Sequence, residues 1–109
     1  MHFYEMKNKL DCEKLYEILR TIPSGKVVTY GMLAEFLGNK KWARAVGNAL
    51  HKNPDADENP CYKVVNSNGE LSAAYTFGGI AEQKRRLEME GIEVKDGRVD
   101  LSVYQIDKK

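Results

Sequence analysis

The chain has 109 residues, which is enough for one small domain with a single core and excludes a separate cofactor domain. Its formal net charge is +1, so any affinity for nucleic acid must come from a local basic patch and not from overall composition. Two cysteines exclude a disulfide scaffold and a four-ligand zinc site, and without a signal peptide or an apolar run of membrane length we expect a soluble cytoplasmic protein.

The first predicted helix begins after Asp11, a good N-cap, and ends at the turn formed by residues 22–25. Apolar residues recur on one of its faces, which indicates a side packed in the core. These residues are Cys12, Leu15, Tyr16, Ile18 and Leu19. We therefore expect Cys12 to be a core residue.

A helix-turn-helix is predicted next. Thr29 follows an extended segment and can cap a helix through Leu37, with Gly38 as the stop. A second helix is expected from about Lys41 to Lys52. The short joint between the two is typical of a helix-turn-helix, whose second helix usually reads a DNA groove.

Residues 53–72 contain the cysteine of greatest interest, Cys61, which lies between Pro60 and a short apolar run. Asn53-Pro54 breaks the preceding helix, and residues 55–59 are polar and predict a loop. Residues 62–66 alternate as a strand does. Asn68-Gly69 is a strong turn signal, so residues 70–72 are expected to pair back onto that strand.

The carboxy-terminal third predicts a helix over residues 80–90, ended by Gly91, and a small hairpin of residues 92–94 and 99–101. The fold class expected from all these elements is a small α/β domain with a winged helix-turn-helix core. A single domain is expected to span residues 1–109.

The predicted second helix carries a local basic patch made of Lys40, Lys41, Arg44 and Lys52, in a stretch without acidic residues. Such a patch can contact several phosphates. Small side chains on the same helix would allow a partner to approach closely; they are Ala43, Ala45, Gly47 and Ala49. Two interpretations stay open from these residues alone: a DNA surface, or a solvated face above a tight helix crossing.

Six motifs occur in order along the chain: residues 23–30, residues 44–47, Asn53-Pro54, Pro60-Cys61 with Val64-Val65, Tyr75 with Gly78-Gly79, and Glu90-Gly91. Together they resemble the O6-alkylguanine-DNA alkyltransferases, also called methylated-DNA-protein-cysteine methyltransferases, and their alkyltransferase-like relatives. The resemblance covers about residues 15–94. Full-length members carry a further amino-terminal domain, so in extent this chain is similar to the stand-alone alkyltransferase-like proteins.

The resemblance implies that the second helix enters the minor groove and that Arg44 replaces a base rotated out of the stack. Tyr30 would crowd the adjoining phosphate and offer its phenol to the everted guanine, while Tyr75 and Thr76 would form a lid over the pocket. The DNA-binding residues carried over are Thr29, Tyr30, Lys41, Ala43, Arg44, Gly47, Lys63, Tyr75 and Thr76. From the residues alone, Arg44 could instead form a surface salt bridge, Tyr30 could pack as an aromatic, and the lid could be an exposed loop.

In active members of this family a cysteine thiolate takes the alkyl group irreversibly, so the protein is consumed. The catalytic residues carried over are Cys61, Tyr62, Glu90, Tyr30 and Asn53. Tyr62 stands where the family has histidine, and Lys63 where arginine is usual. A phenol, with a pKa of about 10, is a weaker base near neutral pH than imidazole, with a pKa of about 6.5. A chain of Glu90, Tyr62, a water and Cys61 could still pass a proton.

Two functions from different classes follow. The first is single-turnover alkyl transfer to Cys61, without any metal or organic cofactor. The second is non-catalytic recognition of O6-alkylguanine that recruits other repair proteins, in which case Cys61 is a structural thiol. A transcription regulator is a third reading, but it predicts dimerisation, and the chain offers no obvious dimer element. We expect a monomer that binds double-stranded DNA, without a membrane, in the cytoplasm at the nucleoid or in a nucleus.

Overall fold

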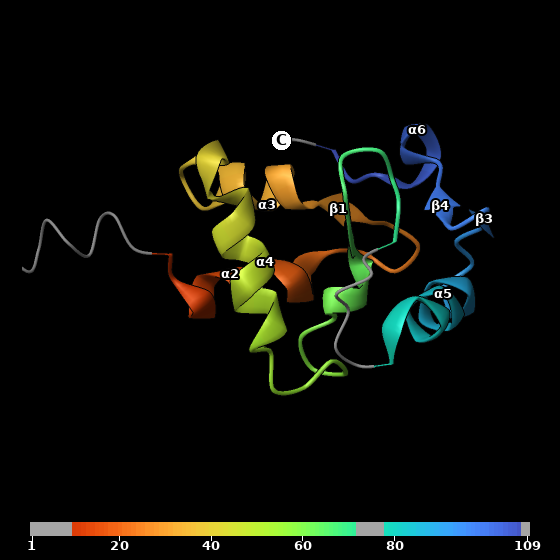
Figure 1. Ribbon diagram of the computed structural model, residues 1–109, viewed down its shortest axis with the longest axis horizontal. Coiled ribbons are helices and arrows are strands. Elements are labelled where there is room, and N and C mark those ends of the chain that lie inside the picture. Colours follow the sequence, from red (N-terminus) through yellow and green to blue (C-terminus); the bar gives the residue numbers. More distant parts are fainter. Residues whose placement is uncertain (1–9, 72–77, 108–109) are drawn as a thin grey trace, which may run out of the picture.

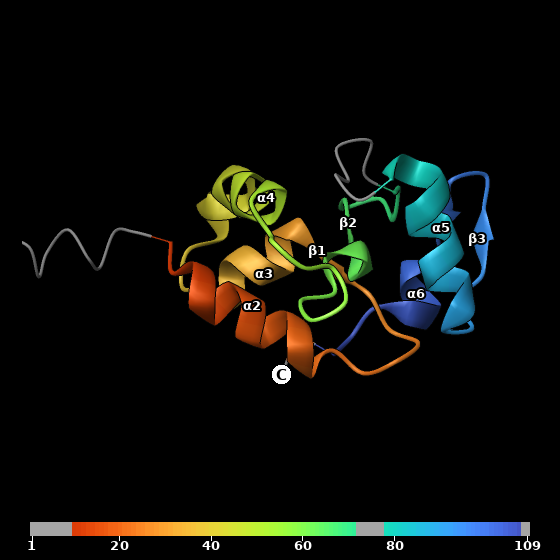
Figure 2. The same cartoon turned by 90° about the horizontal axis from the view of Figure 1, so that it is seen from below.

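The computed structural model describes residues 10–71 and 78–107, and the account below concerns these residues (Figure 1). The α-helices of residues 12–51 lie on one side of a central pair of short strands, and the helices and small hairpin of residues 79–104 lie on the other (Figures 1 and 2). Within these ranges no helix combines the length and the apolar character that a membrane crossing requires.

Helix α2 (Cys12–Thr21) begins where the sequence predicts, because the Asp11 carboxylate accepts the backbone N–H groups of Glu13 and Lys14. Its buried face consists of Leu15, Tyr16 and Leu19. The expectation that Cys12 is a core residue is wrong, since its side chain is exposed. The reason is position: the first turn of α2 lies at the outer end of the helical half, beyond the elements that cover its later turns (Figure 1).

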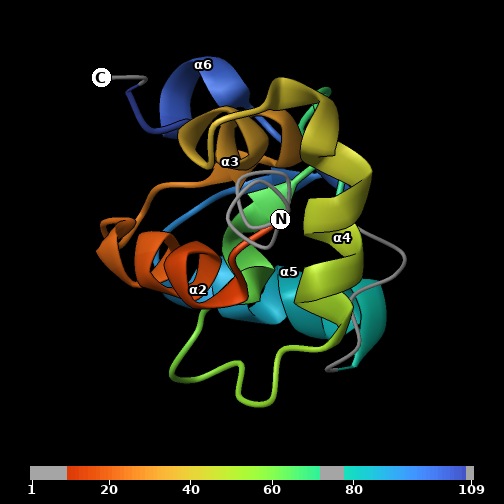
Figure 3. The same ribbon diagram turned by 90° about the vertical axis from the view of Figure 1, so that its left-hand side faces the viewer.

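The helix-turn-helix is formed by α3 (Tyr30–Phe36) and α4 (Ala43–His51), as Figure 3 shows from the side. Thr29 caps α3 as predicted, accepting the N–H of Met32 at 3.1 Å. The second helix starts later than expected, because Lys40–Trp42 form a 3-10 turn, η1, whose N-cap is Asn39. The basic side chains at positions 40 and 41 therefore precede the α-helix.

Strands β1 (Val28–Thr29) and β2 (Val64–Val65) pair in parallel at the centre of the molecule, with Val28 opposite Val64. Because alternate residues of a strand face opposite sides, the pair separates two apolar clusters. Val28 and Val64 belong to the cluster of α2, α3 and α4. Val27 and Val65 belong to a second cluster with Leu87, Ile92, Val94 and Val99. The two strands are thus a wall shared by both halves of the core.

The strand predicted over residues 62–66 is shorter than expected, because Cys61–Lys63 form a 3-10 turn, η2, before β2 begins. Backbone hydrogen bonds explain this turn: the N–H of Cys61 donates to Asn59 O at 2.7 Å and that of Lys63 to Pro60 O at 3.2 Å. Cys61 consequently lies on a tight turn immediately before β2.

The carboxy-terminal half follows the prediction more closely. Helix α5 (Gly79–Met89) matches its expected range to within one residue, and β3 (Val94–Lys95) and β4 (Arg98–Val99) form the expected hairpin. The second strand ends at Val99 and does not continue through residues 100–101 as predicted, because Asp100 caps a short helix, α6 (Leu101–Tyr104).

The turn at Asn68-Gly69 is present, with Gly69 at φ +86°, but its expected strand pairing is wrong. Glu70 instead forms a bridge with Arg98 of β4. It bonds back to Asn66: its backbone oxygen accepts the Asn66 N–H at 3.1 Å, and its own N–H donates to Asn66 Oδ1 at 2.9 Å. The remaining residue of that prediction, Ser72, lies outside the described ranges. The architecture is the expected small α/β domain with a winged helix-turn-helix core.

Candidate active site and DNA interface

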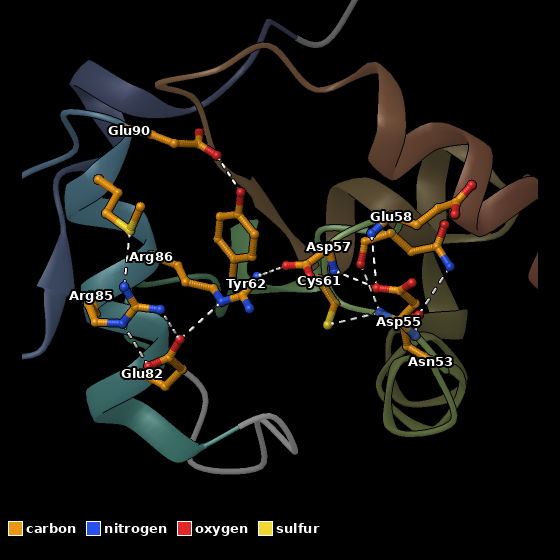
Figure 4. A network of polar contacts seen from close by, with 12 residues as sticks. Asn53, Asp55, Asp57, Glu58, Cys61, Tyr62, Glu82, Arg85, Arg86 and Glu90 are labelled. Atoms are coloured by element: carbon orange, nitrogen blue, oxygen red, sulfur yellow. Dashed lines mark hydrogen bonds and ion pairs between the residues drawn. The ribbon is translucent and has the colours of Figure 1, made fainter.

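Cys61 is a buried residue of the helical cluster, with a side chain 6% exposed. Its sulfur points toward the end of α4 and accepts a hydrogen bond of 3.1 Å from Asn53 Nδ2 (Figure 4). Asn53 lies just beyond Lys52, the C-cap of α4, so the end of this helix before Pro54 also brings an amide to the sulfur. The structure therefore brings together two of the expected catalytic residues.

Asn53 is held by a complete set of hydrogen bonds. Its Nδ2 donates to Cys61 Sγ and, at 2.8 Å, to the backbone oxygen of Asn59. Its Oδ1 accepts the N–H of Asp55 and the Nδ2 of Asn59, each at 3.1 Å. An amide has two donor hydrogens and two acceptor lone pairs, so nothing in this side chain is left unsatisfied. The donor that faces the sulfur is consequently fixed in place.

Two opposing effects act on the Cys61 thiol. Burial raises its pKa, because the thiolate is poorly solvated, and this is the larger effect. The hydrogen bond from Asn53, a backbone N–H and the charge of Arg86 each lower the pKa. The net result is a pKa above the ordinary value, so the free protein holds less thiolate at neutral pH than an exposed cysteine does.

Tyr62 and Glu90 form a direct pair: the Tyr62 hydroxyl donates to Glu90 Oε2 at 2.5 Å. The other carboxylate oxygen, Oε1, accepts the N–H of Gly25 at 3.0 Å. Figure 4 shows that the Tyr62 hydroxyl and the Cys61 sulfur point in different directions. The structure thus contains the Glu90–Tyr62 half of the proposed proton chain, and the link to the sulfur through a water stays a prediction.

Lys63 lies in the interior, 5% exposed, and not on the surface where a phosphate would meet it. Its Nζ donates to Ile22 O at 3.0 Å and lies 3.5 Å from Glu90 Oε1. The ammonium thereby binds a backbone carbonyl at the end of α2 and the Glu90 carboxylate, which also accepts the hydrogen bond from the Tyr62 hydroxyl. A contact between Lys63 and DNA would require it to leave both of these partners.

Arg86 of α5 stacks over the Tyr62 ring, with its guanidinium carbon 5.6 Å from the ring centroid. It also forms ion pairs with Asp57 at 2.8 Å and Glu82 at 3.1 Å, so α5 holds both the tyrosine and the acidic loop before Cys61 (Figure 4). The acidic side chains of that loop are exposed, as suits the predicted polar loop; they are Asp55, Asp57 and Glu58.

The helix-turn-helix brings Tyr30 against Gly47. A Cβ added at Gly47 would meet Tyr30 Cε1 at 3.9 Å, so the ring lies beside the glycine surface of α4. Thr29, expected among the DNA-binding residues, is buried, and its hydroxyl caps α3. Gly47 therefore leaves room for an aromatic ring from α3, as the alternative of a tight helix crossing predicts.

Arg44 projects from the first turn of α4 and is exposed, as are Lys40, Lys41 and Lys52. Among the described residues none forms an ion pair or a side-chain hydrogen bond with these four cations. The alternative of a surface salt bridge for Arg44 thus has no partner in that part of the chain. Ala43, beside it, is partly buried.

Two expected lid residues, Tyr75 and Thr76, lie outside the described ranges, so their placement stays a prediction.

The structure also shows site residues that the sequence did not predict, namely Asn59, Gln83 and Arg20. Gln83 is fully buried and donates to the backbone oxygens of Tyr62 and Val64 at 3.0 and 3.1 Å. A buried glutamine on an amphipathic helix gives no local signal, because its partners lie about twenty residues away in the sequence.

Fold and site together define a helix-turn-helix protein in which a buried cysteine, bonded to an asparagine amide, lies at the end of the second helix. The family model described as "6-O-methylguanine DNA methyltransferase, DNA binding domain" matches residues 12–92, and the chain belongs to this family.

Two relatives show how far the sequence similarity extends. The chain is 48% identical over 93 residues to a bifunctional methyltransferase/endonuclease of Picrophilus torridus, covering 85% of this chain but only 30% of that protein. It is 42% identical over 95 residues to alkyltransferase-like protein 1 of Schizosaccharomyces pombe, covering 86% of this chain and 85% of the relative.

A solved structure shows the same similarity in three dimensions. The S. pombe protein in complex with damaged DNA containing O6-carboxymethylguanine superimposes with a TM-score of 0.80 at 34% identity, over 88% of this chain and 94% of that one. The similarity therefore extends over nearly the whole of a short alkyltransferase-like protein, and over a minor part of a larger bifunctional one.

Proposed function

We propose that this protein binds duplex DNA containing O6-alkylguanine, everts the damaged nucleotide, and transfers the alkyl group irreversibly to Cys61. The observation that carries the proposal is the hydrogen bond from Asn53 Nδ2 to Cys61 Sγ, in a family whose model covers residues 12–92. A donor fixed against sulfur favours the thiolate, which is the nucleophilic form. The solved complexes of the S. pombe relative with DNA support the binding step.

DNA recognition is assigned to α4 and the residues around it. Arg44 is exposed and free of ion pairs to described residues, so its guanidinium can fill the gap left by an everted base and hydrogen-bond the orphaned partner. Lys41 precedes it and is available to a phosphate. Tyr30, supported from behind by Gly47, would press on the adjoining phosphate. Eversion costs a few kcal/mol and least for a weakly paired lesion, which favours damaged over normal sites.

In the transfer step, Cys61 Sγ forms a bond to the alkyl carbon while the bond from that carbon to the guanine oxygen breaks. The electron pair stays on the oxygen, and guanine then takes up one proton, which balances the proton lost by the thiol. Each protein molecule reacts once, because the thioether on Cys61 is stable. The reaction would take place in the compartment that holds the DNA, whether cytoplasm with its nucleoid or nucleus.

A second candidate function, recognition without transfer, is favoured by two observations. Burial raises the pKa of the Cys61 thiol, and Tyr62 occupies the position of the family histidine. The protein would then bind the lesion and recruit other repair proteins.

Intact-mass measurement separates these functions. We expect incubation with a duplex containing O6-methylguanine to add one methyl group, mapped to Cys61 by peptide analysis. Cys61→Ser should abolish the increment, whereas Cys12→Ser, which alters an exposed cysteine, should leave it unchanged. Tight binding without any mass increment would refute transfer and support recognition.

A further inference from the structure

A chain of side-chain amides connects the surface of α2 to the sulfur of Cys61. Arg20, in the last turn of α2, donates from Nε to Asn59 Oδ1 at 3.0 Å. Asn59 donates from Nδ2 to Asn53 Oδ1 at 3.1 Å, and Asn53 donates from Nδ2 to the sulfur at 3.1 Å. Donors therefore point the same way at every link, from the exposed guanidinium to the buried thiol.

The direction of this chain is set at its outer end. An arginine side chain has only donors, so the atom of Asn59 that faces Arg20 must be the carbonyl oxygen. The amide nitrogen of Asn59 must then face Asn53, and the Asn53 atom that it meets must again be an oxygen. Asparagine by itself could be placed either way, because its oxygen and nitrogen are nearly alike in shape.

Backbone groups reinforce the same orientation. Asn53 Oδ1 also accepts the N–H of Asp55, and its Nδ2 also donates to Asn59 O. Both asparagine side chains are buried, each 5% exposed. Aligned hydrogen bonds in such a setting polarise one another, by about 10 to 30% per bond. The positive charge of Arg20 therefore strengthens the hydrogen bond that Asn53 donates to the sulfur.

We propose that Arg20 is a positioning residue for the nucleophile: acting through Asn59 and Asn53, it strengthens the hydrogen bond donated to Cys61 Sγ and so favours the thiolate. Arg20 lies at the opposite end of this series of hydrogen bonds from the sulfur and does not contact it. The inference adds to the proposed function a control of Cys61 reactivity from an exposed residue.

Other charged and titratable groups near the sulfur come from two elements. Arg86 of α5 lowers the pKa of the Cys61 thiol, and burial raises it. Tyr16 of α2 interacts electrostatically with Cys61, and its own pKa is raised mainly by burial. Both groups are left unchanged in every variant below, so differences among those variants report on Arg20.

The test measures the thiol directly, in the full chain without DNA. In a Cys12→Ser background Cys61 is the only cysteine, and its alkylation by iodoacetamide is followed as a function of pH. We expect Arg20→Met to slow alkylation at neutral pH about 2- to 5-fold, with the titration midpoint moved upward, because weakening a charge-assisted bond by the fraction above disfavours the thiolate. Arg20 is exposed, and unchanged urea midpoints would confirm that its variants fold.

Two further variants distinguish the amide chain from a simple effect of charge. Arg20→Gln places an uncharged amide nitrogen where the arginine Nε was, so it should recover at least half of the rate lost in Arg20→Met. Lys14→Met removes a positive charge from the same helix without touching the chain, and should leave the rate unchanged. The inference is overturned if Arg20→Met alkylates at the wild-type rate, if Arg20→Gln is as slow as Arg20→Met, or if Lys14→Met is equally slow.

This inference rests on the proposed role of Cys61 as a nucleophile, but the two can fail separately. Absence of methyl transfer from O6-methylguanine, together with the expected order of iodoacetamide rates, would refute the proposed function and support the amide chain. Methyl transfer with identical iodoacetamide rates in all variants would do the reverse.

Discussion

Replacing Tyr62 with phenylalanine removes a single hydroxyl and leaves the ring beneath Arg86 in place. The lost hydrogen bond is short, 2.5 Å, and its acceptor is the Glu90 carboxylate, whose side chain is 15% exposed. Hydrogen bonds to charged groups contribute about 1.5 to 3 kcal/mol. Glu90 keeps the N–H of Gly25 and the ammonium of Lys63, so the remaining charge is still compensated.

We therefore expect Tyr62→Phe to reduce the free energy of unfolding by about 1.5 to 3 kcal/mol, measured by urea denaturation. For a domain of this size the corresponding fall in Tm is roughly 6 to 20 °C. Tyr104→Phe is a matched control, because the Tyr104 hydroxyl has no hydrogen-bond partner in the part of the chain that the structure describes. That control should change the unfolding free energy by less than about 0.5 kcal/mol.

The same variant tests the proton chain. If Tyr62 passes a proton between Glu90 and the site, Tyr62→Phe should slow methyl transfer at least about 10-fold at a temperature where it is fully folded, and Tyr62→His should restore or exceed the wild-type rate. Equal stability in Tyr62→Phe and Tyr104→Phe would refute the energetic reasoning. A wild-type transfer rate in folded Tyr62→Phe would refute the relay and leave Tyr62 a structural residue.

Three further predictions concern other parts of the molecule. Arg44→Ala should reduce the ratio of affinities for O6-methylguanine duplex and normal duplex about 10-fold or more, in fluorescence anisotropy at fixed salt, while Lys52→Ala should weaken both affinities alike; an unchanged ratio in Arg44→Ala would contradict the finger role. Gly69→Ala should destabilise the fold by about 1 to 3 kcal/mol in urea, because the added Cβ would lie 2.2 Å from Val99 O and φ is +86°, and wild-type stability would show that this turn yields. Hydrogen bonds from Arg85 and Arg86 lower the pKa of Glu82 from 4.5 to about 2, so the stability that ionised Glu82 contributes is present above pH 4.5 and lost as the pH falls toward about 2; in Glu82→Gln the decline of Tm over that window should be shallower, and parallel curves would count against the pairing.

Local patterns were enough to place the elements that begin with a cap or end with a breaker. Asp11 and Thr29 accept the N–H groups that their positions predict, and Asn68-Gly69 turns as expected. These features depend on atoms within four residues of one another, so the sequence alone contains the relevant information.

Elsewhere, predictions from local patterns failed because the environment of a residue depends on contacts with residues distant in the sequence. Cys12 has the right spacing for a core residue, but whether a partner covers the first turn of α2 depends on the tertiary arrangement. Lys63 resembles a surface cation in sequence, yet it binds Ile22 O and Glu90, which are 41 and 27 positions away. Asn59 reads as one polar loop residue among several, and only the approach of Arg20 and Asn53 gives it a place in the site.

The valines at the central strand pair belong to two apolar clusters, Val28 and Val64 to one and Val27 and Val65 to the other, and this has a consequence for protein engineering. A fragment ending before Ile92 would retain the helix-turn-helix but lose Ile92, Val94 and Val99, which belong to the same cluster as Val27 and Val65, so one side of a fully buried strand pair would be partly exposed to water. The helix pair is therefore no portable module. Grafting its lesion specificity onto another scaffold would require transplanting the hairpin as well, even though the hairpin forms part of the opposite half of the molecule.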